Sequence, residues 1–402
     1  MFDEIYWRKY NVFVVFSIRR IYKLKDFSLE VHGAHKYDYT GSISAPLYFS
    51  ATYRHLGYKE STGYDYGRVA NPTRNELEET IAMLERGERA WAVASGMAAI
   101  NMIMQLMKPG EHMLLSEDLY GGTVRLANDI YSRYGIEFDY VNTADTQKVA
   151  AMVKPNTKFI FIETPSNPMM LISDIKKLAD LAHQHKVLLV VDNTFLSPHF
   201  QKPITLGADI VVHSGTKYLC GHNDVIAGFI VVADKDADYT KELELLIKSE
   251  GPNLTPMDAW LMLRSLKTLG LRVERQAENA LKIATWLKSQ RHVTDVYYVG
   301  LATHPGYALQ QEQASGNGSM ISFKVDNADL AKAMLSRLKL ICFAESLGGV
   351  ESLLTYPLVQ THAEMPKYLL DKTGLDDRLL RLSVGIEDVD DLIADLDNAL
   401  NA

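Results

Sequence analysis

The chain has 402 residues, of which 47% are hydrophobic and 23% are charged, and these proportions are ordinary for a soluble globular protein. Its formal net charge of −8, without a long basic run, argues against a nucleic-acid-binding protein. Two cysteines, Cys220 and Cys342, cannot make a disulfide framework and fit a reduced cytoplasmic protein. The length suits one large domain and a smaller one, because single cores stop growing at roughly 250–300 residues.

The N-terminal residues 1–26 stand apart from the rest of the sequence. Their apolar run, Val12–Phe16, is far shorter than the ~20 residues that a membrane-spanning helix needs. No small-residue cleavage site follows the run, so a signal peptide is not predicted either. We expect no membrane association, and we assign residues 1–60 to an N-terminal extension and arm.

From about Ile81 the sequence alternates between strand and helix patterns. Short runs rich in Val, Ile and Leu predict the strands Trp91–Val93, His112–Leu115, Phe159–Glu163, Val187–Asp192 and Ile210–His213. Stretches such as Asp174–His185, with apolar residues three and four positions apart, predict helices between them. This alternation predicts an α/β domain over residues 61–255, with a mostly parallel sheet covered by helices on both faces.

A smaller domain is predicted over residues 256–402. The stretch Met257–Leu287 is strongly helical and is expected to bridge to this domain. A strand pattern at Gly318–Val325 and a helix pattern at Asp329–Leu338 then predict an α+β arrangement.

Reactive side chains follow four of the predicted strands at their carboxyl ends, where open α/β sheets bind ligands. The four segments are Ser95-Gly96-Met97, Glu163-Thr164-Pro165-Ser166-Asn167-Pro168, Asp192-Asn193-Thr194 and His213-Ser214-Gly215-Thr216-Lys217. Each is ordinary alone, because a lysine is usually solvated and a serine or aspartate often caps a helix. Together they supply what pyridoxal phosphate needs. A lysine forms the Schiff base, a carboxylate keeps the pyridine nitrogen protonated, and hydroxyls with helix N-terminal amides hold the phosphate.

The sequence from about Asp26 to Ala402 resembles the trans-sulfuration family of fold-type I pyridoxal-phosphate enzymes. This family includes cystathionine γ-synthases, cystathionine γ- and β-lyases, methionine γ-lyases and O-acetylhomoserine sulfhydrylases. Further motifs that carry the resemblance are Tyr64-Asp65-Tyr66-Gly67-Arg68, Asn71-Pro72-Thr73-Arg74, Tyr120-Gly121-Gly122-Thr123, Ala344-Glu345-Ser346-Leu347-Gly348-Gly349 and Leu380-Arg381-Leu382-Ser383-Val384-Gly385.

The resemblance implies a set of cofactor-binding residues. Lys217 resembles the lysine that carries the cofactor and later moves the α-proton, and Asp192 resembles the partner of the pyridine nitrogen. Asn167 resembles the group beside the phenolic oxygen, and Tyr120 the tyrosine that stacks on the ring and acts as an acid–base group. The phosphate would be held by two backbone amides and two hydroxyls, those of Gly96, Met97, Ser214 and Thr216.

The resemblance also implies a carboxylate site and an assembly. Arg381 and Ser346 resemble the pair that receives the α-carboxylate of the substrate, for which the planar fork of an arginine is suited. Tyr66 and Arg68 resemble residues that reach the phosphate of the neighbouring subunit. We therefore expect a homodimer at minimum, and a homotetramer because family members are usually dimers of such dimers.

Three positions depart from the family pattern. Cys220 stands where relatives often have Asn or Gly, and we expect a small buried residue there rather than a nucleophile. Asn223 stands where Ser is usual. Gly67 replaces a Ser between Tyr66 and Arg68, and is expected to loosen that loop. None of these changes removes a catalytic group.

Two acidic residues favour cystathionine as the substrate. Asp65 precedes Tyr66 and Glu345 precedes Ser346, and in cystathionine-handling relatives acidic groups at these places face the distal end of the substrate. Cystathionine has a second ammonium group there and methionine has none, so a carboxylate pair rewards cystathionine. Structural ion pairs are the alternative use of both acids. Gly122 stands where methionine γ-lyases carry a cysteine, which disfavours that activity.

The predicted activity is cleavage of the C–S bond of cystathionine by α,β- or α,γ-elimination, with pyridoxal phosphate and no metal. Cystathionine γ-synthase or O-acetylhomoserine sulfhydrylase is the alternative, because the same lysine and tyrosine serve γ-replacement. An aminotransferase, which would pass the amino group on, and a non-catalytic cofactor carrier are the other classes considered. The expected partner is a small amino-acid substrate, not a nucleic acid or a membrane.

Overall fold

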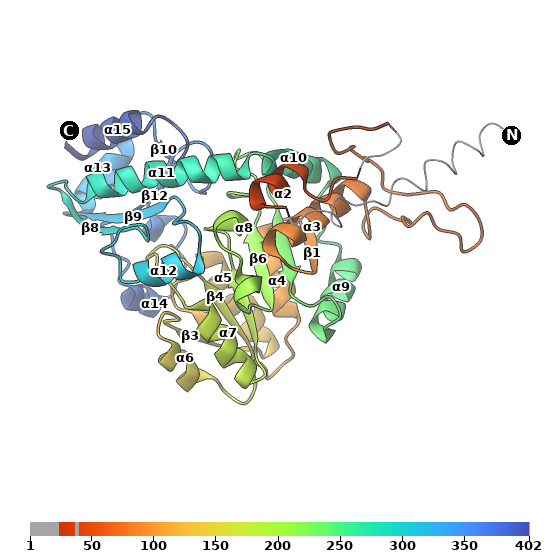
Figure 1. Cartoon of the computed structure of the whole chain (residues 1–402). Coiled ribbons are helices and arrows are strands. Elements are labelled where there is room, and N and C mark those ends of the chain that lie inside the picture. The colour runs from red at the N-terminus through yellow and green to blue at the C-terminus, as the bar shows by residue number, and fades with distance from the viewer. Residues whose placement is uncertain (1–23, 37–39, 402) are drawn as a thin grey trace.

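The computed structural model describes residues 24–36 and 40–401, which form two separate β-sheets with helices around them (Figure 1). The larger sheet comes from residues 89–232 and the smaller from residues 293–383, as the predicted fold class requires. The domain boundaries at residues 60 and 255 stay predictions. Residues 1–23 of the predicted N-terminal extension, including the run Val12–Phe16, lie outside the described residues. Within the described ranges, no helix combines the length and the apolar character that crossing a membrane requires.

The larger sheet has seven strands in the order β1-β7-β6-β5-β4-β2-β3. They are β1 (Arg89–Val93), β2 (His112–Ser116), β3 (Glu137–Val141), β4 (Thr157–Glu163), β5 (Leu188–Asp192), β6 (Ile210–Ser214) and β7 (Gly228–Val232). Neighbours from β3 to β6 pair in parallel, whereas β7 pairs antiparallel with β6 and with β1. The five predicted strands are confirmed with small shifts at their ends, and β3 and β7 were not predicted.

Helices cover both faces of this sheet, because its central strands are apolar on both sides. In β5, for example, Val191 packs into the core on one face and Val190 into the core on the other. The first face carries α3 (Pro72–Glu85) and α7 (Ile175–Gln184), and the second carries α4 (Gly96–Gln105) and α9 (Asp238–Glu250). Shorter segments are α5 (Gly121–Arg125), α6 (Thr146–Met152), α8 (Ser197–Phe200), a π-helical turn at Leu126–Ile130 and 3₁₀ turns at Tyr131–Tyr134 and Pro203–Leu206.

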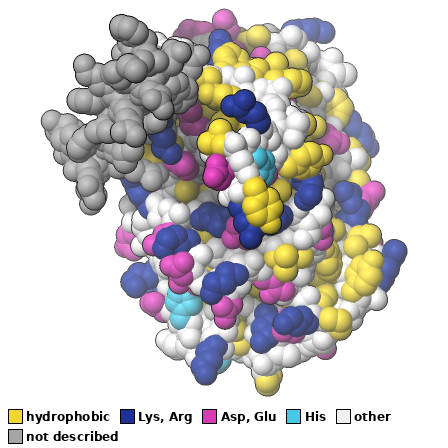
Figure 2. All heavy atoms as spheres, turned by 90° about the vertical axis from the view of Figure 1, so that its right-hand side faces the viewer, with side chains coloured by type: hydrophobic (Ala, Val, Ile, Leu, Met, Phe, Trp, Pro, Cys, Tyr) yellow, Lys and Arg dark blue, Asp and Glu magenta, His cyan; other side chains and the backbone are white. Residues whose placement is uncertain are grey.

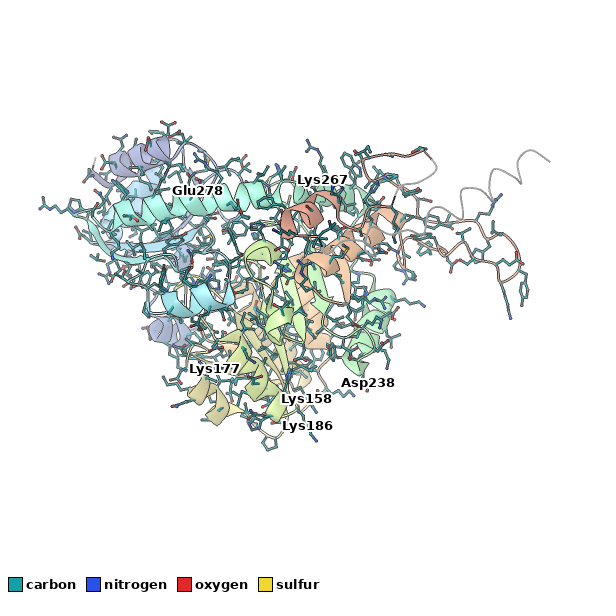
Figure 3. The ribbon with its side chains drawn as sticks, in the orientation of Figure 1. Lys158, Lys177, Lys186, Asp238, Lys267 and Glu278 are labelled. Atoms are coloured by element: carbon teal, nitrogen blue, oxygen red, sulfur yellow. The ribbon has the colours of Figure 1, made fainter. Side chains whose placement is uncertain are left out.

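The carboxyl ends of the parallel strands point toward the second sheet. Lys158, at the amino end of β4, and Lys186, just before β5, lie at the bottom of the molecule in Figure 3, on the side away from the second sheet. The opposite ends of the strands, where the predicted reactive side chains follow, therefore lie toward the region between the two sheets.

The smaller sheet has five strands in the order β10-β11-β12-β9-β8. They are β8 (Val293–Tyr297), β9 (Met320–Val325), β10 (Cys342–Phe343), β11 (Leu353–Thr355) and β12 (Leu379–Ser383). Its helical segments are α12 (Tyr307–Gln313), α13 (Ala328–Arg337), α14 (Lys367–Thr373), α15 (Val389–Asn401) and a 3₁₀ turn at Pro357–Val359. The predicted strand and helix of this domain are confirmed as β9 and α13. Arg381 lies in β12, where it is the backbone partner of Thr355 in β11.

The predicted helical stretch Met257–Leu287 is two helices, α10 (Pro256–Leu266) and α11 (Leu269–Leu287). The break lies at Thr268, whose hydroxyl donates to the carbonyl oxygen of Ser265 at 3.2 Å. Such a bond from a threonine side chain competes with the helical pattern, and apolar spacing alone does not reveal it.

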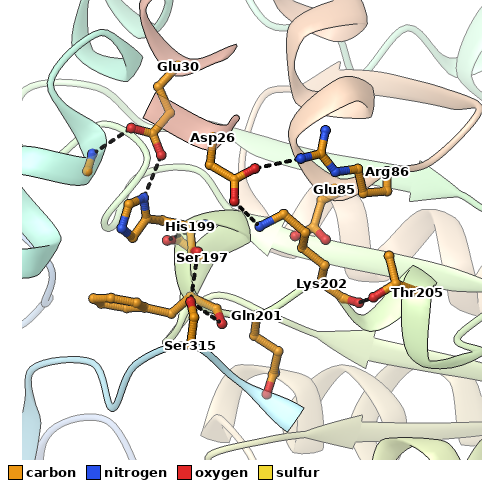
Figure 4. A network of polar contacts seen from close by, with 12 residues as sticks. Asp26, Glu30, Glu85, Arg86, Ser197, His199, Gln201, Lys202, Thr205 and Ser315 are labelled. Atoms are coloured by element: carbon orange, nitrogen blue, oxygen red, sulfur yellow. Dashed lines mark hydrogen bonds and ion pairs between the residues drawn. The ribbon is translucent and has the colours of Figure 1, made fainter. Parts of the chain in front are cut away.

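The first described helix, α2 (Asp26–His32), is tied to the body by buried polar contacts (Figure 4). Glu30 pairs with His199 at 2.6 Å and accepts the backbone amide of Gly270, the second residue of α11, at 2.9 Å. A Cβ atom at Gly270 would lie 2.5 Å from the ring of Phe27. Glycine is therefore needed there for α2 to pack this closely on α11.

Candidate active site

A cavity of about 250 Å³ lies where the ends of β4, β5 and β6 meet the second domain. Most of the residues predicted for cofactor and substrate line its wall. They are Gly96, Met97, Tyr120, Asn167, Asp192, Ser214, Thr216, Lys217, Glu345, Ser346 and Arg381. The fold therefore brings groups from both halves of the sequence to one place. For the groups of the first half, this was expected from their positions at the ends of strands.

Asp192 ends β5 as a buried carboxyl group with one oxygen held in place. Its Oδ1 accepts the backbone amide of Thr194 at 3.0 Å and the hydroxyl of Thr194 at 2.5 Å. The same hydroxyl oxygen accepts the backbone amide of Ser214 at 2.9 Å, which links β5 to β6. Burial raises the pKa of Asp192, and a cation bound at its other oxygen would oppose that rise. A protonated pyridine nitrogen fits this place.

The start of α4 offers donors for a phosphate. Ser95 caps the helix by accepting the amide of Ala98 at 3.0 Å. The amides of Gly96 and Met97 have no acceptor within the helix, because they lie in its first turn. A Cβ atom at Gly96 would lie 2.7 Å from the Cβ of Ser214, so glycine is what allows the helix to approach β6 this closely. The helix amides and the Ser214 hydroxyl thus border one small region with partial positive charge, which fits an anionic phosphate.

Lys217 follows β6 by three residues, and its Nζ donates to the hydroxyl oxygen of Ser346 at 2.9 Å. Burial, with a smaller contribution from the charge of Arg381, lowers the pKa of Lys217 to about 8. A substantial neutral fraction is what an amine needs to attack a carbonyl group. The hydroxyl group of Thr216, which was predicted to bind the phosphate, already bonds both the amide and the carbonyl of Ala227.

Arg381 on β12 is only 1% exposed and lies at the cavity wall. It donates to Asn167 Oδ1 at 2.8 Å, to the Ser346 carbonyl at 3.2 Å and to Thr355 Oγ1 at 3.3 Å. Its Nε has no hydrogen-bond partner among the described residues. Burial lowers the pKa of Arg381 to about 10, so the guanidinium is still charged at neutral pH. A charged guanidinium at the cavity wall fits a substrate carboxylate.

Glu163 and Thr194 line the same cavity, although the sequence analysis assigned them no role. The signal that pointed to their neighbours, a place at or just after the end of a strand, applies to both, since they lie at or just after the ends of β4 and β5. Thr361 also lines the cavity, and it comes from a loop of the second domain. The sequence held no signal for Thr361.

Three predicted site residues lie outside this cavity. They belong to residues 43–69, which we call the arm from here on and which extend past residue 60, the boundary expected from the sequence. Asp65 pairs with His55 at 3.0 Å, and Tyr66 and Arg68 are in mutual contact, with the guanidinium carbon 5.7 Å from the ring centroid. Figure 1 shows part of the arm, in orange, projecting away from the body. In this structure none of the three residues lines the cavity of its own chain.

The structure describes the surroundings of two departures from the family pattern. Cys220 is fully buried and its Sγ lies 3.1 Å from Asp224 Oδ1, which agrees with a small buried residue. Burial raises the pKa of its thiol, the opposite of what a nucleophile needs. Whether Gly67 loosens its loop relative to a serine stays a prediction. The amide of Gly67 donates to Ala51 at 2.7 Å and its carbonyl accepts from Arg74 at 3.0 Å, so its backbone is held on both sides.

Comparison with known proteins gives one family. The sequence model of the Cys/Met metabolism PLP-dependent enzymes matches residues 28–401. Cystathionine γ-lyase of Bacillus subtilis (strain 168) is 46% identical, over 94% of this chain and 99% of the relative. Cystathionine β-lyase of Lactococcus lactis subsp. cremoris (strain MG1363) is 44% identical, over 92% of this chain and 97% of the relative. A solved structure of cystathionine γ-synthase from Xanthomonas oryzae pv. oryzae in complex with cystathionine has a TM-score of 0.91 and 38% identity, over 94% and 98% of the two chains.

Cystathionine γ-synthase of Haemophilus influenzae (strain ATCC 51907 / DSM 11121 / KW20 / Rd) is 46% identical, over 89% of this chain and 92% of the relative, so lyases and synthases are similar to this chain to nearly the same degree. What they share is the family and its cofactor, and the cavity described above has the groups that this cofactor needs. The chain therefore belongs to the family of PLP-dependent enzymes of Cys/Met metabolism, and its cofactor is pyridoxal 5′-phosphate.

Proposed function

We propose that this enzyme cleaves a carbon–sulfur bond of cystathionine by α,β- or α,γ-elimination. The observation that carries the proposal is that Arg381, Glu345 and Lys217 line one cavity. A cation for the α-carboxylate and an acid for a distal ammonium group suit a substrate that is charged at both ends. Cystathionine has this form, whereas methionine lacks the distal ammonium group.

When it is bound, pyridoxal phosphate supplies an electron sink for the carbanion at the α-carbon. Asp192 keeps the pyridine nitrogen protonated. Arg381 holds the α-carboxylate and so fixes the orientation of the Cα–H bond. Lys217, whose pKa is lowered to about 8, takes the α-proton as the general base. Tyr120, which lines the cavity wall, would stack on the ring and serve as the second acid–base group.

The choice between eliminations depends on a second proton. β-Elimination expels sulfur from Cβ directly, whereas γ-elimination and γ-replacement first require a proton to leave Cβ. Lys217 and Tyr120 can serve both routes, so γ-synthase or sulfhydrylase activity is the second candidate, favoured by the similarity to the cystathionine γ-synthase structure. Methionine γ-lyase and aminotransferase activities are less favoured, because Glu345 would then lack a partner on the substrate.

Incubation of the purified enzyme with L-cystathionine, followed by identification of the products, tests the proposal. Homocysteine with pyruvate and ammonia shows β-cleavage, and cysteine with 2-oxobutyrate and ammonia shows γ-cleavage. Either result supports a cystathionine lyase. No cleavage, together with condensation of an activated homoserine with cysteine, contradicts the lyase and supports the synthase. The Lys217→Ala variant is the control for turnover by a contaminating enzyme.

We also propose a homodimer at minimum, with a homotetramer as the usual family form. The arm exposes large apolar side chains: Ile43, Phe49 and Tyr58 are 74%, 78% and 90% exposed. Hydrophobic side chains gather on the face that Figure 2 turns to the viewer, beside the residues drawn in grey. Exposed apolar surface of this kind marks an interface. A cytoplasmic location is proposed on the two free thiols, Cys220 and Cys342.

A further inference from the structure

Glu163 is a third carboxyl group in the cavity, besides Asp192 and Glu345, and the proposed mechanism gives it no role. It is the last residue of β4, and it pairs across the parallel ladder with Asp192, the last residue of β5. Paired residues on neighbouring strands point to the same face of a sheet, so both carboxyl groups enter the cavity side by side. Glu163 is 5% exposed and Asp192 is 9% exposed. Two carboxyl groups this close in a buried site do not both ionise, because each charge opposes the other.

The hydrogen bonds favour Asp192 as the charged member of the pair. One oxygen of Asp192 accepts two bonds, from the amide and the hydroxyl of Thr194, and bonds of this kind stabilise a carboxylate. Glu163 accepts one bond, from the backbone amide of Tyr120 at 3.1 Å. The function of the cofactor also places the charge on Asp192, because the pyridine nitrogen needs an anion beside it.

The charged groups around Glu163 do not reverse this assignment. Arg381 is the cation that acts on it, but the guanidinium donates to Asn167, Ser346 and Thr355 instead. Burial, followed by the charge of Asp192, raises the pKa of Glu163 well above its usual value, and Asp118 adds to the rise. The Tyr120 amide and Arg381 oppose the rise and are outweighed.

Glu163 also fixes the backbone from which Tyr120 projects. The amide of Tyr120 donates to Glu163, and its carbonyl accepts the amide of Thr123 at 2.9 Å, at the start of α5. We propose that Glu163 is a positioning residue that stays protonated, holds the Tyr120 backbone so that the phenol can cover the cofactor ring, and leaves the negative charge beside the pyridine nitrogen to Asp192. The inference rests on the proposed role of Tyr120 and does not depend on which substrate is cleaved.

Two substitutions separate the bond from the charge. Glu163→Gln keeps the acceptor oxygen and the shape of a neutral acid, whereas Glu163→Leu keeps only similar bulk. With whichever substrate the wild type converts, Glu163→Gln should stay within about threefold of its kcat/KM, with an unchanged pH profile. Glu163→Leu should lose about 10- to 100-fold, mostly in kcat, because a displaced Tyr120 affects the reaction more than binding. Asp192→Asn, the matched change on the adjacent strand, should lose about 100- to 1,000-fold.

Thermal unfolding of the purified full-length enzyme, with cofactor bound, gives a readout that needs no turnover. If folded Glu163 keeps its proton, the wild type loses stability as pH rises above about 4.3, where the unfolded chain releases that proton. Glu163→Gln has no titratable proton at this position, so its stability does not fall with pH in this way. The Tm of Glu163→Gln minus that of the wild type should therefore become more positive from about pH 5 to about pH 8.

The outcomes decide the proposal even if Glu163→Leu does not fold. A Tm difference that does not change with pH, or that becomes negative, overturns the protonated form of Glu163. A loss of activity in Glu163→Gln that approaches that of Asp192→Asn also overturns it. Wild-type activity in a folded Glu163→Leu overturns the positioning role. A failure of the cystathionine proposal leaves these results intact, because none of them depends on that substrate.

Discussion

The cavity wall and the arm both carry predicted site residues, but they lie in opposite surroundings. In the cavity, Arg381 is 1% exposed and makes three hydrogen bonds within the chain. On the arm, Tyr66 is half exposed and the neighbouring Tyr58 is 90% exposed. Buried polar groups need their partners within the fold, whereas exposed apolar groups gain from a partner outside it. We infer that one chain positions the chemical groups and that the arm of a neighbour completes their site.

The largest expected effect is at Lys217, within the cavity. Lys217→Ala should still bind pyridoxal phosphate non-covalently, but turnover should fall by several orders of magnitude, because both the covalent link and the proton carrier are removed. Borohydride reduction of the wild type followed by mass spectrometry should place the cofactor on Lys217. A label on another lysine would show that the cavity is not the cofactor site. Lys177→Ala, on the outer surface of α7 (Figure 3), is the control and should behave as the wild type.

The next largest effect is expected at Glu345, on the cavity wall. Glu345→Ala should lower kcat/KM for cystathionine about 10- to 100-fold, which corresponds to roughly 1.4–2.7 kcal/mol, because the bound substrate would remove this exposed carboxylate from water. Methionine and O-acetylhomoserine, which lack a distal ammonium group, should lose little. Arg381→Ala should impair all of these substrates alike, since each has the same α-carboxylate.

Glu351→Ala is a matched control for Glu345, because Glu351 is exposed and bonds Asn223 outside the cavity. It should leave the substrate preference unchanged. If Glu345→Ala lowers the activity on cystathionine and on methionine by the same factor, Glu345 has a structural role and the cystathionine proposal loses its main support.

The third prediction concerns stability rather than activity, and it tests the docking of α2, the helix that precedes the arm. Burial lowers the pKa of His199, but its hydrogen bond and charge interaction with Glu30, with help from Glu274, outweigh burial and raise the pKa overall. A raised folded-state pKa gives stability that is full below about pH 6.5, the unfolded value, and that is lost as pH rises through the folded value.

His199→Gln should therefore cost about 1.5–3 kcal/mol near pH 6, the usual contribution of a hydrogen bond to a charged group, and clearly less near about pH 9. Thermal unfolding at both pH values measures the difference. His183→Gln is the control, because His183 forms a surface pair with Asp209 that contributes about 0–1 kcal/mol. An equal loss at both pH values would mean that the charge of His199 does not hold α2.

Much of the fold was predictable because the strands are short apolar runs between amphipathic helices. β7 was missed because a continuous apolar run such as Gly228–Val232 is not distinguished from a buried helix by periodicity. The break at Thr268 was missed because it depends on a side-chain bond. The motif Asn71-Pro72-Thr73-Arg74 was noted only as a family resemblance. In the structure Asn71 caps α3, accepting the amides of Thr73 and Arg74, so part of that motif has a local structural cause.

The site was predictable where its residues follow strands, since parallel strand ends meet at one edge of a sheet. The relation between Glu163 and Asp192 was not predictable, because it depends on the register of β4 against β5. Thr361 comes from a loop of the second domain, and no pattern in its own neighbourhood marks it. The location of Asp65, Tyr66 and Arg68 outside the cavity also depends on tertiary structure, and it is what separates the arm from the cavity wall.

A mixing experiment tests most directly the claim that two subunits build one site. Arg68→Ala affects the arm and Lys217→Ala affects the cavity, so a hybrid dimer has one site with both defects and one with neither. We expect each variant alone to lose most of its activity. Random exchange of their subunits should restore roughly a quarter of wild-type activity, since half of the dimers are hybrids with one intact site in two. Recovery near that level would support the claim. No recovery, with hybrid dimers demonstrated by differently tagged subunits, would show that the arm serves the cavity of its own chain and would contradict the account.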